Sequence, residues 1–104
     1  MWQGEYFKDA IEDLKCLDRN QRLQVLKAIN KVSSNPLPQN EEGFGKSLGN
    51  RNSARLAGYL KIKLKRLGLR VGYKLIREKY VMKVIEVSAR ADDEVYLLAQ
   101  KRTD

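Results

Sequence analysis

The 104-residue sequence contains no histidine and a single cysteine, Cys16. One cysteine cannot form an internal disulfide, and without histidine or further cysteines the chain lacks the usual ligands of a structural zinc ion. Any acid or base chemistry must therefore use lysine, arginine, tyrosine, aspartate or glutamate side chains. These absences exclude a disulfide scaffold and a zinc site of the cysteine–histidine type.

Long hydrophobic runs and structure breakers are also scarce. No apolar stretch approaches the roughly 20 residues of a membrane-spanning helix, and residues 1–5 carry neither the basic nor the hydrophobic region of a secretion signal. Only two prolines and seven glycines interrupt a chain that is 42% hydrophobic, a composition typical of globular proteins. We therefore expect a single domain over residues 1–104, cytoplasmic and without a membrane partner.

Acidic residues are nearly absent from the stretch between positions 51 and 83. Residues 1–50 carry seven Lys/Arg and seven Asp/Glu, whereas residues 51–104 carry fourteen and six, so the whole net charge of +8 lies in the second half. Between positions 51 and 83 there are eleven cations and one anion, Glu78. A surface this basic is typical of proteins that bind a polyanion such as nucleic acid.

Hydrophobic periodicity predicts the elements of the first half. A short strand over residues 2–6 precedes two segments in which apolar residues recur every three or four positions. This spacing predicts one helix over about residues 7–17 and a second that follows Asp18, a favourable N-cap, and ends near Ser34. We expect the two helices to form a hairpin. Residues 35–57 hold both prolines and three glycines, which predicts a long loop.

Alternation of apolar and polar residues predicts strands over residues 60–65 and 69–75. The turn at residues 77–79 leads into a third strand over residues 80–88, and helical spacing resumes over residues 92–102. In this pattern Tyr73 belongs to the apolar face. If the strands form an antiparallel meander, the cations share one open face. The turns then predict three facing pairs across the strands: Lys63 with Gly72, Lys61 with Lys74, and Arg70 with Glu86.

Four short motifs stand out: Leu60-Lys61-Ile62-Lys63-Leu64, Gly68-Leu69-Arg70-Val71-Gly72-Tyr73, Ala89-Arg90 and Glu94-Val95-Tyr96. Together they resemble the RelE branch of the RelE/ParE toxin superfamily, the toxic half of bacterial toxin–antitoxin pairs. The resemblance is ungapped over about residues 59–102. It implies a small α+β domain in which an antiparallel β-sheet carries the N-terminal α-helical hairpin on one face and a concave basic site on the other, with a short C-terminal helix.

The resemblance further implies a ribosome-dependent endoribonuclease that cleaves mRNA in the ribosomal A site. The 2′-hydroxyl of the RNA attacks the adjacent phosphorus, and neither a metal nor another cofactor is needed. By resemblance, Lys63 is the base, Lys61 and Arg70 stabilise the transition state, and Arg90 acts as the acid or stabilises the leaving oxygen. Tyr96 lies one position off the apolar stripe of its helix, which favours a role in orienting or stacking on the substrate.

Further contacts with RNA are expected from four cations of the basic half: Arg51, Arg55, Lys65 and Lys74. The partners implied by the resemblance are a cognate RelB-like antitoxin, the ribosome and its mRNA, with operator DNA reached only through the antitoxin. Glu86 is expected to face Arg70, either as a salt-bridge partner or as a second candidate base.

Two other functions remain open at this stage. A ParE-like toxin poisons gyrase without cutting RNA, but it has no need for the set of lysines and arginines described above. A non-catalytic RNA-binding module would use the same cations as phosphate contacts only, and an activity measurement separates it from an enzyme.

Overall fold

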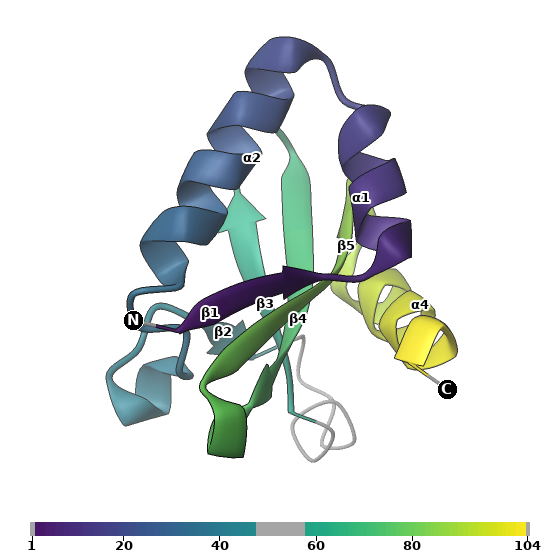
Figure 1. Ribbon diagram of the computed structural model, residues 1–104. Coiled ribbons are helices and arrows are strands. Elements are labelled where there is room, and N and C mark those ends of the chain that lie inside the picture. Colours follow the sequence, from purple (N-terminus) through teal and green to yellow (C-terminus); the bar gives the residue numbers. More distant parts are fainter. Residues whose placement is uncertain (1, 48–57, 104) are drawn as a thin grey trace.

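The computed structural model describes residues 2–47 and 58–103, and within these ranges the chain forms one five-stranded sheet with three helices (Figure 1). The sheet order is β1-β5-β4-β3-β2, with the strands β1 Gln3–Tyr6, β2 Lys46–Ser47, β3 Tyr59–Leu64, β4 Leu69–Ile76 and β5 Val81–Ser88. The helices are α1 Lys8–Lys15, α2 Arg19–Val32 and α4 Asp92–Thr103. The expected α+β class is confirmed. None of the described helices is long and apolar enough to cross a membrane.

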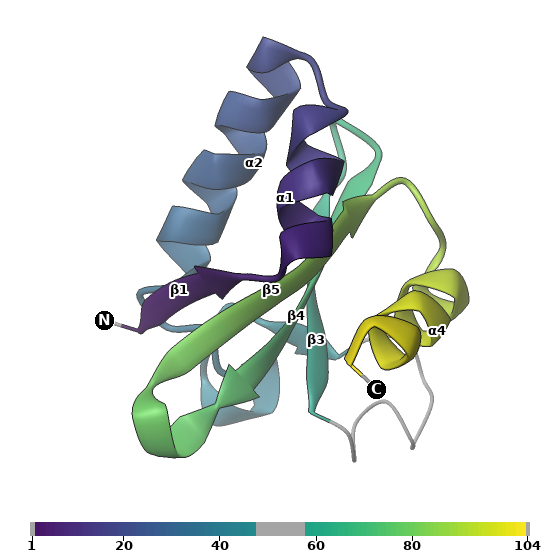
Figure 2. The ribbon, with the colours of Figure 1, turned by 45° about the vertical axis from the view of Figure 1, so that its right-hand side comes forward.

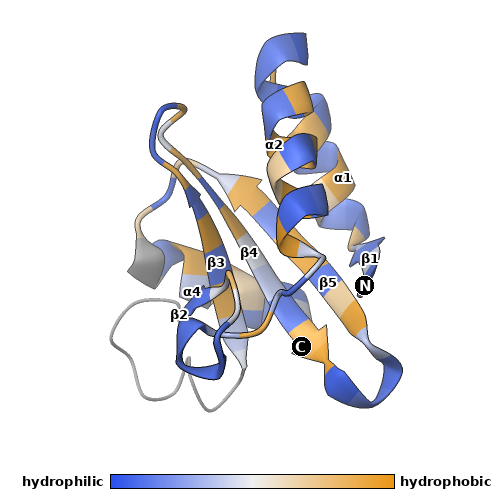
Figure 3. Ribbon diagram, turned by 90° about the vertical axis from the view of Figure 1, so that its left-hand side faces the viewer, coloured by the Kyte–Doolittle hydropathy of each residue, from blue (hydrophilic) through white to orange (hydrophobic). Residues whose placement is uncertain are grey.

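The helical hairpin of α1 and α2 covers one face of the sheet (Figures 1 and 2). Asp18 begins α2 with a capping box, because its carboxylate accepts the Gln21 N–H at 2.8 Å and the Gln21 side chain accepts the Asp18 N–H at 3.2 Å. Both helices lie within two residues of the bounds that periodicity predicted. Their buried stripes pack on the apolar side of the strands, whose alternation is visible as orange and blue bands in Figure 3.

Tyr73 lies at the centre of this core, as the alternation predicted, and it is completely buried. Its hydroxyl donates a hydrogen bond of 2.8 Å to the carbonyl of Pro36. Burial raises the pKa of this phenol, which keeps it neutral and a donor. The bond ties the segment after α2 to the middle of the sheet.

The sheet is mixed, which corrects the expectation of a wholly antiparallel sheet. β1 pairs with β5 in parallel, with Gln3 opposite Val81 and Tyr6 opposite Val84. An antiparallel direction is required only where a tight turn joins two neighbouring strands, and β1 and β5 are separated by most of the chain. The three longer strands do form the expected antiparallel meander.

The predicted strand register is wrong by two residues. Gly68, with a φ of 66°, closes the β3–β4 turn in the left-handed region, so the turn occupies residues 65–68. Between β4 and β5, Tyr80 belongs to the turn with a φ of 53°, and a β-bulge leaves Ile85 unpaired. A shift of two positions leaves the side chains of β3 and β4 on their predicted faces, whereas the bulge puts Val84 and Glu86 on opposite faces of β5. The observed facing pairs are Lys61 with Gly72, Lys63 with Arg70, Tyr59 with Lys74, Gly72 with Glu86, and Arg70 with Ser88.

Helix α4 packs on the opposite face of the sheet from the hairpin (Figure 2). It buries a second apolar cluster that consists of Tyr59, Ile85, Val95, Tyr96 and Ala99. The face that the sequence predicted to be open and basic is therefore covered by α4 where this cluster lies.

Candidate functional site

The face opposite the hairpin carries two cross-strand rows of residues, which we call the basic face. One row is Lys61, Gly72 and Glu86, and the other is Lys63, Arg70 and Ser88. Side chains directly opposite each other in an antiparallel pair have Cβ atoms about 4.5–5.5 Å apart. Three of the residues predicted to be catalytic, Lys61, Lys63 and Arg70, are thus brought together. Lys63 is exposed, whereas Lys61 and Arg70 are half-buried.

Arg90, the fourth predicted cation, reaches this group through its backbone. It follows β5 by two residues and is exposed. The Arg70 guanidinium donates a hydrogen bond of 2.9 Å from Nη1 to the Arg90 carbonyl. The Arg90 N–H in turn donates to the Ser88 hydroxyl at 3.3 Å. Two of the predicted catalytic residues are therefore directly linked.

Tyr96 does not lie off the apolar stripe of its helix, and that expectation is wrong. Only 6% of the residue is exposed, and its ring packs edge-on against Tyr59 with the ring centroids 5.7 Å apart. Val95, Tyr96 and Ala99 all face the sheet, because a helix that lies against a sheet buries adjacent positions as well as those three and four apart. Contact between Tyr96 and a substrate stays a prediction.

The residues predicted to contact RNA fall into three situations. Lys65 is exposed in the β3–β4 turn, where it lines a hollow together with Lys63 and Arg70. The Lys74 ammonium lies 5.6 Å from the centre of the Tyr59 ring, a cation–π contact at the α4 end of the basic face. Arg51 and Arg55 lie outside the described residues.

Glu86 lies opposite Gly72, whereas the sequence placed it opposite Arg70. It is completely buried, and its Oε1 accepts a 2.9 Å hydrogen bond from the Ser88 hydroxyl. Oε2 has no hydrogen-bond partner among the described residues. Burial raises the pKa of this carboxyl, against the opposite pull of the Ser88 hydrogen bond and the charges of Arg102 and Arg90.

Sequence reasoning missed an ion pair that holds α4 in place. Arg102 donates from Nη1 to Asp13 Oδ2 at 2.8 Å and to the Ile85 carbonyl at 2.9 Å. The same Asp13 oxygen accepts the Val87 N–H at 3.0 Å. The pair joins α1, the bulged part of β5 and the last turn of α4. No local pattern could reveal it, because its two members lie near opposite ends of the chain.

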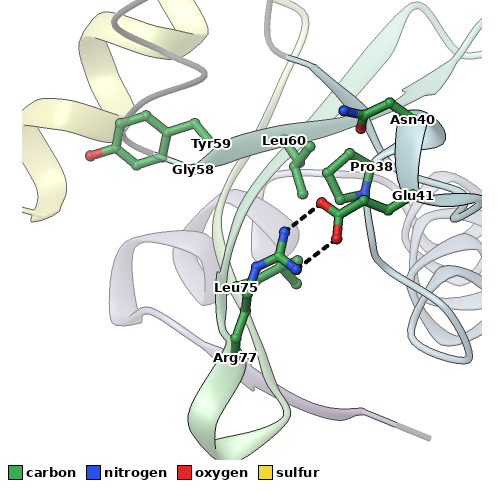
Figure 4. Close-up of a pocket in the computed structure, with 8 residues that line it drawn as sticks. All are labelled: Pro38, Asn40, Glu41, Gly58, Tyr59, Leu60, Leu75 and Arg77. Carbon is green, nitrogen blue, oxygen red and sulfur yellow. Dashed lines mark hydrogen bonds and ion pairs between the residues drawn. The ribbon is translucent and has the colours of Figure 1, made fainter.

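A pocket lies away from the two rows of the basic face, between β3, the end of β4 and the turn at Gln39–Glu41 (Figure 4). Arg77 spans it with a bidentate pair to Glu41, two hydrogen bonds of 2.8 Å each. This hydrogen bonding lowers the pKa of the Glu41 carboxyl. The pair ties the turn to the sheet, and none of the residues predicted to be catalytic lines this pocket.

Comparison with known proteins agrees with the motifs, although no protein-family model matches the sequence. A RelE-like toxin protein of Escherichia coli is 30% identical over an alignment of 105 positions, which covers 97% of this chain and 96% of that protein. An arginine double mutant of the Escherichia coli toxin RelE in the free state superposes with a TM-score of 0.75 at 28% identity, over 97% of this chain and 96% of that one.

The same mutant in complex with a peptide of the antitoxin RelB has a TM-score of 0.68 at 26% identity, over 94% of this chain and 93% of the toxin. The similarity therefore extends over nearly the full length of each chain, in sequence and in fold. Together with the motifs on β3, on β4, just after β5 and on α4, it shows that this chain belongs to the family of RelE-like toxins.

Proposed function

We propose that this protein is a ribosome-dependent endoribonuclease that cleaves mRNA in the ribosomal A site. The observation that carries the proposal is the pair of rows on the basic face, which brings Lys61, Lys63 and Arg70 together and links Arg70 to the Arg90 carbonyl. A plain phosphate-binding surface needs positive charge, but it does not need cations arranged around one point. Transphosphorylation of RNA does need that arrangement.

In the proposed reaction, the 2′-oxygen of one nucleotide forms a bond to the adjacent phosphorus while the bond from phosphorus to the 5′-oxygen breaks. The products are a cyclic phosphate and a 5′-hydroxyl. Lys63, as the neutral amine, accepts the proton of the 2′-hydroxyl, and Lys61 and Arg70 neutralise the charge that develops on the phosphoryl oxygens. Because the nucleophile is part of the RNA itself, the reaction proceeds without a metal or another cofactor.

Arg90 has a more limited role in this scheme than a general acid. A guanidinium remains charged in proteins, so Arg90 stabilises the negative charge on the departing 5′-oxygen, which takes its proton from solvent. The hydrogen bond from Arg70 to the Arg90 carbonyl keeps the two guanidinium-bearing residues adjacent.

The proposed partners follow from the family and from the charge. A solved relative binds a peptide of its antitoxin, and we infer that a RelB-like antitoxin neutralises this chain by covering the basic face. Operator DNA would then be contacted only through that antitoxin. The ribosome supplies mRNA and a polyanionic surface that matches the net charge of +8. Both partners imply that the protein acts in the cytoplasm.

The test compares three alanine variants of cations near the same face: Lys63→Ala, Arg70→Ala and Lys65→Ala. Cleavage is measured by primer extension on mRNA from a purified translation mixture, with and without ribosomes. The first two variants should lose about 100-fold or more of the cleavage rate, the scale expected for a base or a transition-state cation. Lys65→Ala removes one positive charge from a residue that has no role in the proposed reaction. Its effect on cleavage should therefore be small and should come only from weaker RNA binding.

Three results would contradict the proposal in different ways. Equal losses of cleavage rate for Lys65→Ala and Lys63→Ala would show that the basic face acts only through its total charge and that Lys63 has no specific role. Cleavage of naked RNA at a similar rate would contradict ribosome dependence. Absence of cleavage by the parent protein would favour a ParE-like toxin or a non-catalytic RNA-binding module.

A further inference from the structure

The basic face contains a buried acid that the proposed reaction does not use. Glu86 is completely shielded from solvent, two residues before the end of β5 and in the same row as Lys61 and Gly72. A carboxyl is expensive to bury, because it exchanges water for a less polar environment. An apolar residue would fill the same space at lower cost, so the presence of an acid calls for a specific contact.

The surroundings of Glu86 leave little freedom for its side chain. A Cβ atom built on Gly72 would lie 3.2 Å from Glu86 Cγ and 3.2 Å from Val95 Cγ1, so the missing side chain of Gly72 makes room for both. The charged groups that act on the carboxyl are Arg90, Arg102 and Asp13. Glu86 is therefore enclosed between β4 and α4, with its carboxyl near the end of β5.

Two hydrogen bonds lead from the carboxyl to the Arg90 N–H, and the backbone of Arg90 connects that group to the carbonyl that accepts Arg70. The Ser88 hydroxyl donates to Glu86 Oε1 at 2.9 Å, and the Arg90 N–H donates to the Ser88 oxygen at 3.3 Å. On the other side of the same residue, the Arg90 carbonyl accepts the Arg70 guanidinium at 2.9 Å. Each link is a direct contact between described atoms.

The order of donors in this chain explains why an acceptor is needed at position 86. A serine hydroxyl has one proton and two lone pairs. When Glu86 accepts the proton, a lone pair of the Ser88 oxygen is left to receive the Arg90 N–H. Without that acceptor the hydroxyl rotates freely, and the exposed segment after β5 loses the hydrogen bond that orients the Arg90 N–H.

We propose that Glu86 is a positioning residue that, through the Ser88 hydroxyl, fixes the Arg90 peptide and with it the Arg70 guanidinium in the geometry required for cleavage. The inference rests on the proposed function for its catalytic consequence. The two arginines carry like charges, which repel each other. The fixed Arg90 carbonyl accepts the Arg70 guanidinium and so keeps Arg70 opposite Lys63 despite this repulsion.

The enzymatic test uses variants that keep or remove the acceptor. Glu86→Gln retains an oxygen that can accept the Ser88 proton, and its kcat in the ribosome assay should stay within about threefold of the parent. Glu86→Ala and Ser88→Ala should each lower kcat about tenfold or more with KM for ribosomes unchanged, because the interaction is used in the transition state. The double variant should be no slower than either single variant, since both act through one chain.

A matched control is Ser33→Ala. Ser33 is also buried, and its hydroxyl donates a 2.7 Å hydrogen bond to the Asn30 carbonyl at the end of α2, in no contact with the basic face. The loss of this hydroxyl tests the general effect of removing a buried serine hydrogen bond. Its kcat should equal that of the parent.

A second measurement is independent of cleavage. Backbone ¹⁵N order parameters for residues 88–91 should be near 0.85 in the parent and in Glu86→Gln, and should fall below about 0.6 in Glu86→Ala and Ser88→Ala. If the parent cleaves no RNA, the proposed function fails, and these order parameters alone decide the positioning role. Should Glu86→Ala not fold, Ser88→Ala provides the same comparison at a half-buried position.

Two outcomes would overturn the inference. Unchanged order at residues 88–91 in both alanine variants would show that the hydrogen-bond chain does not hold the arginine segment. A loss of about 100-fold in Glu86→Gln, with order parameters like those of the parent, would show that the ionised carboxyl itself takes part in the chemistry as a base.

Discussion

Replacing Arg102 by methionine should loosen α4 from the rest of the fold. In the native protein, Arg102 donates to Asp13 at 2.8 Å and to the Ile85 carbonyl at 2.9 Å. The two charged side chains are only 15% and 19% exposed. After the substitution, the Asp13 carboxylate still accepts a hydrogen bond from the Val87 N–H but has lost the arginine. The Ile85 carbonyl at the bulge has lost the hydrogen bond from Arg102.

The size of the effect follows from this burial. Removing one partner of a buried ion pair costs about 3–5 kcal/mol, whereas exposed pairs contribute about 0–1 kcal/mol. Because some of each side chain still reaches water, the lower end applies, about 3 kcal/mol. For a domain of about 100 residues, 1 kcal/mol corresponds to about 4–8 °C, so Tm should fall by roughly 12–24 °C.

Thermal unfolding followed by circular dichroism provides the assay, with a double-mutant cycle as its sharper form. Asp13→Leu should be as costly as Arg102→Met, but the double variant should cost much less than the sum, since an apolar pair can replace a buried ion pair. Lys15→Met is the control, because it breaks an exposed pair with Glu12 whose side chains are 67% and 60% accessible. Additive losses in the cycle, or a shift for Arg102→Met no larger than that of the control, would refute the reasoning.

Three further predictions concern single residues. Tyr96→Ala removes a ring buried between α4 and the sheet, so the free energy of unfolding measured by urea titration should fall by about 3–5 kcal/mol. Tyr96→Phe should keep the fold. A folded Phe variant that does not cleave mRNA would assign a catalytic role to the hydroxyl. Burial raises the pKa of Glu86, so the folded state loses stability as pH rises from below the ordinary pKa of 4.5 through the raised pKa. Glu86→Gln removes this ionisation and should therefore increase Tm at pH 7 but not at pH 4. An equal gain at both pH values would contradict the burial argument. Because the Arg77 hydrogen bond lowers the pKa of Glu41, Arg77→Ala should raise the NMR titration midpoint of that carboxyl, and an unchanged midpoint would mean that the pair does not form in solution.

The accuracy of sequence reasoning differed between the helices and the strands for a physical reason. The periodicity that predicts α1 and α2 depends on neighbours along the chain, and the Asp18 capping box spans only four residues. The faces of β3 and β4 were also predicted correctly, because alternation survives a shift of two residues. The register itself was not, since it depended on where the turn closed by Gly68 begins, on the left-handed turn residue Tyr80 and on the bulge at Ile85.

The sequence by itself determined the α+β class, the concentration of positive charge in the second half, and the motifs that mark a RelE-like toxin. Tertiary structure decided how those residues meet: Glu86 buried against Gly72, Arg70 on the Arg90 carbonyl, and Tyr96 packed under α4. Local patterns encode which face a residue occupies. A bulge, a buried acid and an ion pair between the two ends of the chain arise only when distant segments pack together, because their energies depend on contacts that no stretch of sequence contains.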